Sequence, residues 1–211
     1  MQHDANEAFP LEGSCRDDFA GIAEEFRRNL SARGELGASV AVMVGGETVV
    51  DLWGGWIDVA RTRPWARDTI AVTMSSTKAA TALCAHMLAA EGDLDFDAPV
   101  YRYWPEFAAA GKREVLVRHV LSHQAGLPAL RTQLKPGAFY DWEYMIERLA
   151  AEALFSKPGS SCGYHGLTFG YLVGELVRRV SGQALGEFFR REVAEPLGID
   201  YWIGLPAGER A

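Results

Sequence analysis

Ser75 and Lys78 form an S-x-x-K pattern, Ser75-Ser76-Thr77-Lys78, at the start of an alanine-rich apolar stretch. If a helix begins at Ser75, positions three apart lie on one face, so the lysine ammonium can reach the serine hydroxyl. The positive potential at a helix N-terminus favours a developing alkoxide and disfavours the charge of the lysine. The pattern is therefore typical of a serine nucleophile that is activated by a neighbouring amine.

A simpler interpretation of the same four residues is that Ser75 caps the helix and Lys78 lies on the surface one turn later. Ten serines and four lysines in 211 residues give roughly 0.2 chance matches to this pattern per chain. The small number of lysines makes Lys78 more informative than a lysine usually is, but the pattern alone does not decide between the two interpretations.

Tyr164 begins the sequence Tyr164-His165-Gly166, which follows Pro158-Gly159 and precedes an amphipathic stretch. A tyrosine at the junction of a loop and a helix can relay a proton from a nucleophile to a leaving group when a lysine is close. His165 and Trp142 are candidate substrate-binding residues. Both also have a structural interpretation, since a histidine beside a glycine often makes structural hydrogen bonds and most interior tryptophans are packing residues.

Ser122 and His123 lie in a third segment, Leu121 to Pro128. A serine directly beside a histidine does not form a nucleophile–base pair by itself, and no acidic partner for the histidine is indicated. We therefore interpret this segment as a structural turn after a helix.

The composition is that of an ordinary globular protein, with 48% hydrophobic and 23% charged residues, and it excludes disorder, collagen and coiled coil as the main state. The net charge of −7 argues against nucleic acid as a partner, since such binding requires a basic face. Three cysteines without paired spacing indicate reduced thiols and show no metal-site pattern. The sequence has no signal-peptide pattern and no apolar run long enough to span a membrane, so it predicts a cytoplasmic protein that does not act at membranes.

The elements that must position these residues follow from periodicity and from the placement of glycine and proline. Two β-rich runs, 38–44 and 47–53, are joined by Gly45-Gly46 and predict a hairpin. Residues 69–74 are a further candidate strand, and 93–114 are expected to be an irregular surface stretch. Helices are predicted at 15–33, 76–91, 115–122, 140–153, 167–181 and 184–195, the last of them ended by Pro196 and Gly198.

This order of elements predicts a mixed α/β (α+β) class. We expect residues 1–14 to be an N-terminal tail, residues 15–75 to hold a helix and the hairpin, and residues 76–211 to be mostly helical.

The order of the motifs resembles that of the serine β-lactamase-related superfamily, which includes class C β-lactamases, D-Ala-D-Ala carboxypeptidases and family VIII carboxylesterases. The resemblance extends from about residue 15 to 205, and the esterase branch is most similar, through the stretch Gly163 to Glu175. The matching pieces, in order, are the hairpin at 38–53, Ser75-x-x-Lys78, His119 to Leu127, Pro158-Gly159, Tyr164 and Glu195-Pro196-Leu197-Gly198.

The resemblance implies a β-lactamase/transpeptidase-like fold, a helical region plus an antiparallel sheet with helices on its faces. It also implies a serine hydrolase that acts on a small-molecule ester or amide without metal or cofactor. Ser75 would form an acyl-enzyme, and Lys78 and Tyr164 would share the acid and base work. The alternatives are a β-lactamase or D-Ala-D-Ala peptidase and an inactive truncated fragment. Gly166 stands where the lactamase and peptidase branches usually have asparagine, which favours the esterases.

Members of this superfamily are much longer and have further strands with a third motif, for which we find no candidate after Tyr164. We therefore expect an incomplete sheet and a 211-residue chain that is poorly active alone, since loss of one oxyanion donor costs on the order of 10²–10³ in rate. The exposed edge of the hairpin is expected to promote association. The sequence does not indicate an oligomeric state.

Overall fold

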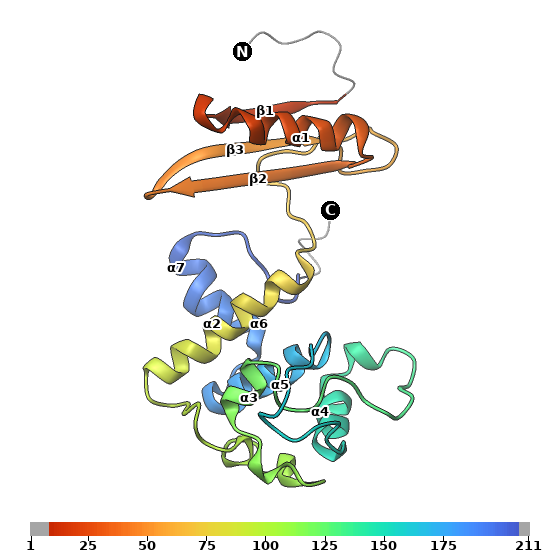
Figure 1. The fold of residues 1–211 in the computed structure, drawn as a ribbon, viewed down its shortest axis with the longest axis vertical. Helices are drawn as coiled ribbons and strands as arrows, with labels where there is room; N and C mark the ends of the chain where they lie inside the picture. The colour runs from red at the N-terminus through yellow and green to blue at the C-terminus, as the bar shows by residue number, and fades with distance from the viewer. Residues whose placement is uncertain (1–8, 207–211) are drawn as a thin grey trace. The chain divides into compact units, whose positions relative to one another are not determined.

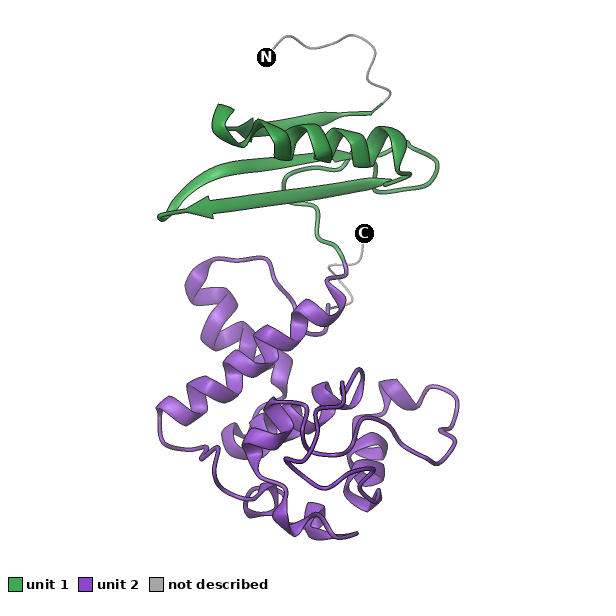
Figure 2. Cartoon of the chain, viewed as in Figure 1, with its two compact units in different colours: residues 1–71 green, residues 72–211 purple. Residues whose placement is uncertain are grey.

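The computed structural model describes residues 9–206 and has two compact units, residues 1–71 and 72–211 (Figure 2). The division lies between residues 71 and 72, whereas the sequence analysis placed a boundary after residue 75. Each unit has its own hydrophobic core. The expected tail of residues 1–14 lies outside the described residues as far as residue 8.

Unit 1 is a helix packed on a three-stranded antiparallel sheet (Figure 1). The sheet has the order β1-β3-β2, with β1 at Leu11–Cys15, β2 at Gly37–Val44 and β3 at Glu47–Gly55. A 3-10 turn at Asp17–Phe19 leads into α1, Ala20–Ala32. The buried residues between helix and sheet are Ala23, Phe26, Val49, Val50 and Leu52.

The predicted hairpin is confirmed. Gly45 and Gly46 form its two-residue turn with φ values of 60° and 85°. Positive φ at both central residues is what a tight hairpin turn of the right twist requires, and glycine adopts it without steric cost.

The N-terminal part of the chain differs from the expected tail, because Leu11–Cys15 pairs with β3 along its whole length. This strand lacks an apolar alternation, so the sequence pattern did not indicate it. The absence of a side chain at Gly13 lets β1 approach the backbone of β3 closely. It has φ of 109°, and a Cβ at this position would lie 2.0 Å from the carbonyl oxygen of Asp51.

Unit 2 is helical, and within residues 9–206 all strands lie in unit 1. Its central pair is α2, Thr77–Ala90, against α5, Thr168–Ser181. The other helices are α3 at Val117–Leu121, α4 at Trp142–Ala151, α6 at Leu185–Phe189, a π-helical segment at Arg190–Ala194 and α7 at Glu195–Leu197. Single 3-10 turns lie at Met74–Ser76, Val100–Arg102, Pro105–Ala108, Lys112–Glu114 and Ala138–Tyr140.

Three local predictions for this unit and the segment before it differ from the structure. Residues 69–74 form no strand. The stretch 93–114 is not a surface segment, because Trp104 and Phe107 are fully buried in the core. The helix predicted at 184–195 continues through the π-helical segment and past Pro196 to Leu197, and Gly198 ends it with a left-handed φ of 61°.

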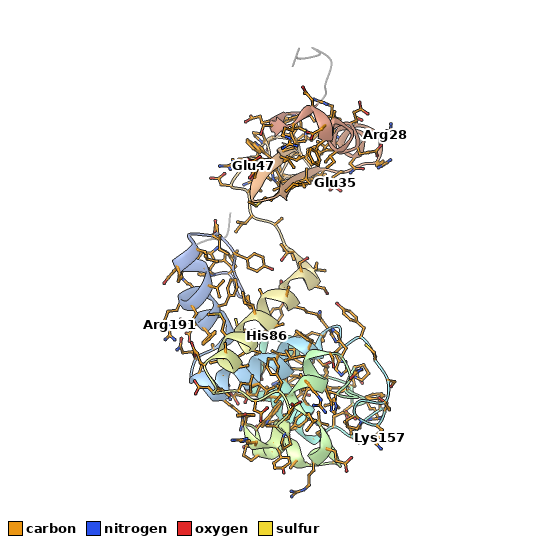
Figure 3. The ribbon with its side chains drawn as sticks, turned by 60° about the vertical axis from the view of Figure 1, so that its left-hand side comes forward. Arg28, Glu35, Glu47, His86, Lys157 and Arg191 are labelled. Atoms are coloured by element: carbon orange, nitrogen blue, oxygen red, sulfur yellow. The ribbon has the colours of Figure 1, made fainter. Side chains whose placement is uncertain are left out.

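The polar residues labelled in Figure 3 are exposed: Arg28, Glu35 and Glu47 in unit 1 and His86, Lys157 and Arg191 in unit 2. The described residues contain no helix that is long and apolar enough to cross a membrane. The α+β class with a small, open antiparallel sheet agrees with the prediction.

Candidate active site

Ser75 lies in the 3-10 turn Met74–Ser76, which continues directly into α2. The turn is bent at Met74, which has φ of 48°, a left-handed conformation that is uncommon for a residue with a side chain. The Ser75 side chain is exposed and does not cap the helix; its oxygen instead accepts hydrogen bonds from two other residues. The capping interpretation of the S-x-x-K pattern is therefore not what the structure shows.

Lys78 lies one turn after Ser75 and faces it, as the spacing predicted. Its Nζ donates to Ser75 Oγ at 3.1 Å and to the carbonyl oxygen of Gly166 at 2.8 Å. The rings of Tyr164 and Phe169 lie 4.9 and 5.9 Å from the same nitrogen. Among the residues that the structure describes, no carboxylate forms an ion pair with it. The amine is therefore held by neutral groups beside the serine hydroxyl.

Tyr164 is the third residue of the site and comes from a different part of the chain. Its hydroxyl donates to Ser75 Oγ at 2.6 Å, and 59% of the residue is exposed. The hydrogen bond with Ser75, and then the Lys78 ammonium, lower the pKa of the phenol from its usual range. Both contacts favour the phenolate, so Tyr164 is suited to exchange a proton with the serine.

His165 is buried beneath the site and does not lie at its surface. The residue is 1% exposed, its Nδ1 donates to the carbonyl oxygen of Gly163 at 2.5 Å, and its Nε2 accepts from the Leu127 N–H at 3.0 Å. Burial lowers the pKa of this imidazole and so favours its neutral form. The hydrogen bond that Nε2 accepts requires the tautomer with its proton on Nδ1. These contacts support a role in holding the loop of Tyr164 and do not support the predicted contact with substrate.

Trp142, the other predicted substrate-binding residue, packs on α5. Its indole N–H donates to Glu175 Oε2 at 2.9 Å, and its ring lies 5.3 Å from that of Tyr171. None of these contacts joins it to Ser75, Lys78 or Tyr164. Substrate binding by Trp142 stays a prediction that its packing does not support.

His123 is the residue at this site that the sequence interpretation underrated. It has φ of 60°, its Nδ1 accepts from the His165 N–H at 3.1 Å, and its ring lies 5.0 Å from the ring of Tyr164. Burial, and then the charge of Lys78, lower its pKa. His123 thus supports Tyr164 from behind. The one signal in the sequence was its place in a turn that matches the family motif.

The described residues contain no group of three or more histidine, cysteine or acidic side chains arranged to hold a metal ion. The arrangement that the structure does show is a serine hydroxyl between an amine and a phenol. Such a site can transfer an acyl group, because the amine or the phenol, once deprotonated, can accept the serine proton.

A family model described as beta-lactamase matches residues 22–211. The chain is 42% identical over 188 residues to the esterase/beta-lactamase LipL of Mycobacterium tuberculosis, which covers 89% of this chain and 43% of LipL. It is 31% identical to the esterase EstB of Burkholderia gladioli, over 82% of this chain and 48% of EstB.

Two solved structures have the same fold. A penicillin-binding protein homologue from Caulobacter crescentus superposes with a TM-score of 0.90 at 46% identity, over 95% of this chain and 54% of the other. A family VIII carboxylesterase superposes with a TM-score of 0.88 at 45% identity, over 95% and 55%. The chain thus spans about half the length of these relatives. The predicted β-lactamase-like fold is confirmed, and the chain belongs to the beta-lactamase family.

Proposed function

We propose that this protein is a carboxylesterase-like serine hydrolase that cleaves carboxylic esters through an acyl-enzyme on Ser75. The main support is that Ser75 Oγ lies within hydrogen-bond distance of both Lys78 and Tyr164. The relatives that are named esterase and carboxylesterase support ester hydrolysis as the reaction class.

In the first half of the proposed reaction, Ser75 Oγ attacks the ester carbonyl carbon and its proton passes to the Lys78–Tyr164 pair. The backbone N–H of Ser75, at the start of the helical segment, donates to the oxyanion that forms. The tetrahedral intermediate then collapses, the bond to the alcohol oxygen breaks, and the pair returns the proton to that oxygen.

In the second half, a water molecule attacks the acyl carbon of the ester formed on Ser75. The same pair takes a proton from the water and gives one to Ser75 Oγ as the bond to the acyl group breaks. The carboxylic acid is released and the serine is regenerated. Each step uses only side chains, a backbone amide and water.

Hydrolysis of β-lactams or of D-Ala-D-Ala peptides is the second candidate, because LipL is named both esterase and beta-lactamase. Gly166 argues against this second candidate. It lies two residues after Tyr164, has no side chain to hold a substrate amide, and its carbonyl oxygen is already bonded to Lys78. Faster turnover of nitrocefin than of esters would favour this candidate.

We also propose a cytoplasmic location for the protein. Cys15, Cys84 and Cys162 are all free thiols in the structure. Free thiols persist in reducing compartments, whereas exported proteins tend to form disulfides. Cell fractionation with an antibody against the protein tests this location.

The hydrolase proposal is tested by comparing Ser75→Ala with Ser76→Ala, a serine in the same turn. We expect Ser75→Ala to abolish hydrolysis of p-nitrophenyl butyrate and labelling by an alkyl phosphonate, and Ser76→Ala to keep both. Mass spectrometry of the labelled peptide identifies the modified serine. Ester hydrolysis that survives in Ser75→Ala would disprove the proposal.

A further inference from the structure

We infer that the hydroxyl of Tyr201 is a positioning group for the nucleophile, because it fastens the turn that presents Ser75. The Tyr201 oxygen lies 3.1 Å from Thr73 Oγ1 and 3.3 Å from Thr77 Oγ1. Thr73 and Thr77 lie two residues before and two residues after Ser75. The inference rests on the proposed role of Ser75 as nucleophile.

The three hydroxyl groups form a closed ring. Tyr201 donates to Thr77, and the oxygens of Thr73 and Thr77 are themselves 3.3 Å apart. Since a hydroxyl has one proton and two lone pairs, each member can donate once and accept once within the ring. If the tyrosine hydroxyl were removed, the contact between Thr73 and Thr77 would remain. Among the residues that the structure describes, it would be the one side-chain contact that joins the two ends of the turn.

The position of Tyr201 is set independently of the turn that it contacts. Its ring packs on Phe189 of α6 with a centroid distance of 5.5 Å. The segment leading to it is fixed by Gly198, which ends α7 with φ of 61°, and by the Ile199 N–H, which donates to the carbonyl oxygen of Ala194 at 3.0 Å. Tyr201 is thus attached to the helical core of unit 2.

The turn needs such a restraint because of Met74. Its left-handed φ of 48° is unfavourable for a residue with a side chain, and the residue is 78% exposed, so packing does not hold it. A strained backbone persists only where its surroundings impose it. The Ser76 N–H donates to the carbonyl oxygen of Thr73 at 3.1 Å, and the hydroxyl ring supplies the side-chain restraint on the same turn.

Tyr201 does not contact Ser75 Oγ, whose partners are Lys78 and Tyr164. A group that acts only through the turn changes the fraction of molecules in which the turn holds Ser75 in its reactive position. It has no reason to change substrate binding or the ionisation of Lys78 and Tyr164. The expected signature is a lower kcat with an unchanged KM and an unchanged pH profile.

The first experiment compares Tyr201→Phe with the wild-type protein. We expect the rate of phosphonate labelling at Ser75, and kcat for p-nitrophenyl butyrate, to fall on the order of 5-fold to 10-fold, which is the effect of one hydrogen bond. The matched control is Tyr103→Phe, which removes a hydroxyl that accepts from the Asp95 N–H at 2.8 Å. We expect this control to label at the wild-type rate.

The second experiment is a double-mutant cycle with Thr77→Val. If the tyrosine acts through this threonine, Tyr201→Phe has little further effect in the Thr77→Val background. Circular dichroism checks that each variant is folded at the assay temperature. If Tyr201→Phe does not fold, Thr73→Val removes another member of the ring and is measured in its place, with the same expected loss.

The possible failures are distinguishable. A wild-type protein that is not labelled at Ser75 would overturn the proposed function. A wild-type protein that is labelled, together with a folded Tyr201→Phe variant labelled equally fast, would overturn only the positioning role. Additive effects in the cycle, or a loss that appears only in KM, would also overturn it.

Discussion

Tyr164 donates a hydrogen bond to Ser75 over 2.6 Å, although the two residues are 89 positions apart in the chain. Lys78 reaches the same oxygen from within its own helix, at 3.1 Å. The two partners of the Ser75 hydroxyl therefore come from independent segments. Each can be altered without removing the other, which separates the contribution of the phenol from that of the amine.

Removal of the phenol oxygen in Tyr164→Phe is expected to lower kcat for p-nitrophenyl butyrate on the order of 10²–10⁴, the usual contribution of a general acid–base group. Folding should be unaffected, because 59% of the residue is exposed. Steady-state kinetics and a thermal melt measure the two effects. Tyr140→Phe is the control, at a tyrosine that is 95% exposed. A Tyr164→Phe variant with wild-type kcat would exclude Tyr164 from the proton transfer.

Lys78→Arg separates a base from a fixed charge. A guanidinium keeps its positive charge at all accessible pH values, so it cannot accept the serine proton. We expect phosphonate labelling of Ser75 to slow by at least about 100-fold, in line with the loss of a general base. The matched control is Lys157→Arg, at an exposed lysine in the same unit (Figure 3). Wild-type labelling of Lys78→Arg would mean that only the charge of the lysine matters.

Local patterns were sufficient to predict part of this molecule. The S-x-x-K spacing placed Ser75 and Lys78 on one helical face, and Gly45-Gly46 predicted the turn of the hairpin. In both cases the interacting residues are close in sequence, so the geometry of a single helix or turn determines their contact. The alanine-rich stretch after Ser75 likewise predicted α2 to within two residues of its observed ends.

Contacts between distant segments could not be predicted in this way. Leu11–Cys15 is a strand because its backbone pairs with β3, and its side chains give no sign of it. Tyr201 meets Thr73 across 128 positions, and only the packing of the helices brings them together. The buried state of His165 also depends on two separate loops. These features follow from tertiary packing, which overrides local propensity.

The buried imidazole of His165 is expected to make stability depend on pH. Burial holds its pKa below the ordinary range in the folded protein, so the unfolded chain, with a pKa of about 6.5, binds a proton more readily. The contribution of the neutral imidazole to the free energy of unfolding is therefore fully present above pH 6.5. It is lost as the pH falls below 6.5 toward the pKa of the folded protein.

Thermal melts at pH 7.5, 6.5 and 5.5 test this dependence. The wild-type Tm should fall with pH, and His165→Gln should weaken that dependence, with a remainder from His119 and His123, whose pKa values are shifted in the same direction. His86→Gln, at an exposed histidine, is the control and should follow the wild type. An equal dependence in His165→Gln and wild type would show that His165 does not titrate in this range.

Gly13→Ala tests whether the pairing of the edge strand β1 with β3 requires a residue without a side chain at position 13. A Cβ at Gly13 would lie 2.0 Å from the carbonyl oxygen of Asp51, and φ of 109° is unfavourable for alanine, so β1 has to move away from β3. We expect a loss on the order of 1–3 kcal/mol in the free energy of unfolding and faster hydrogen exchange in β1. Gly21→Ala is the control, since a Cβ at this position of α1 would meet no atom within 4 Å beyond the backbone of its own helix. It should stabilise the helix by up to about 1 kcal/mol. Equal exchange of β1 in Gly13→Ala and wild type would mean that the strand accommodates a side chain at this position.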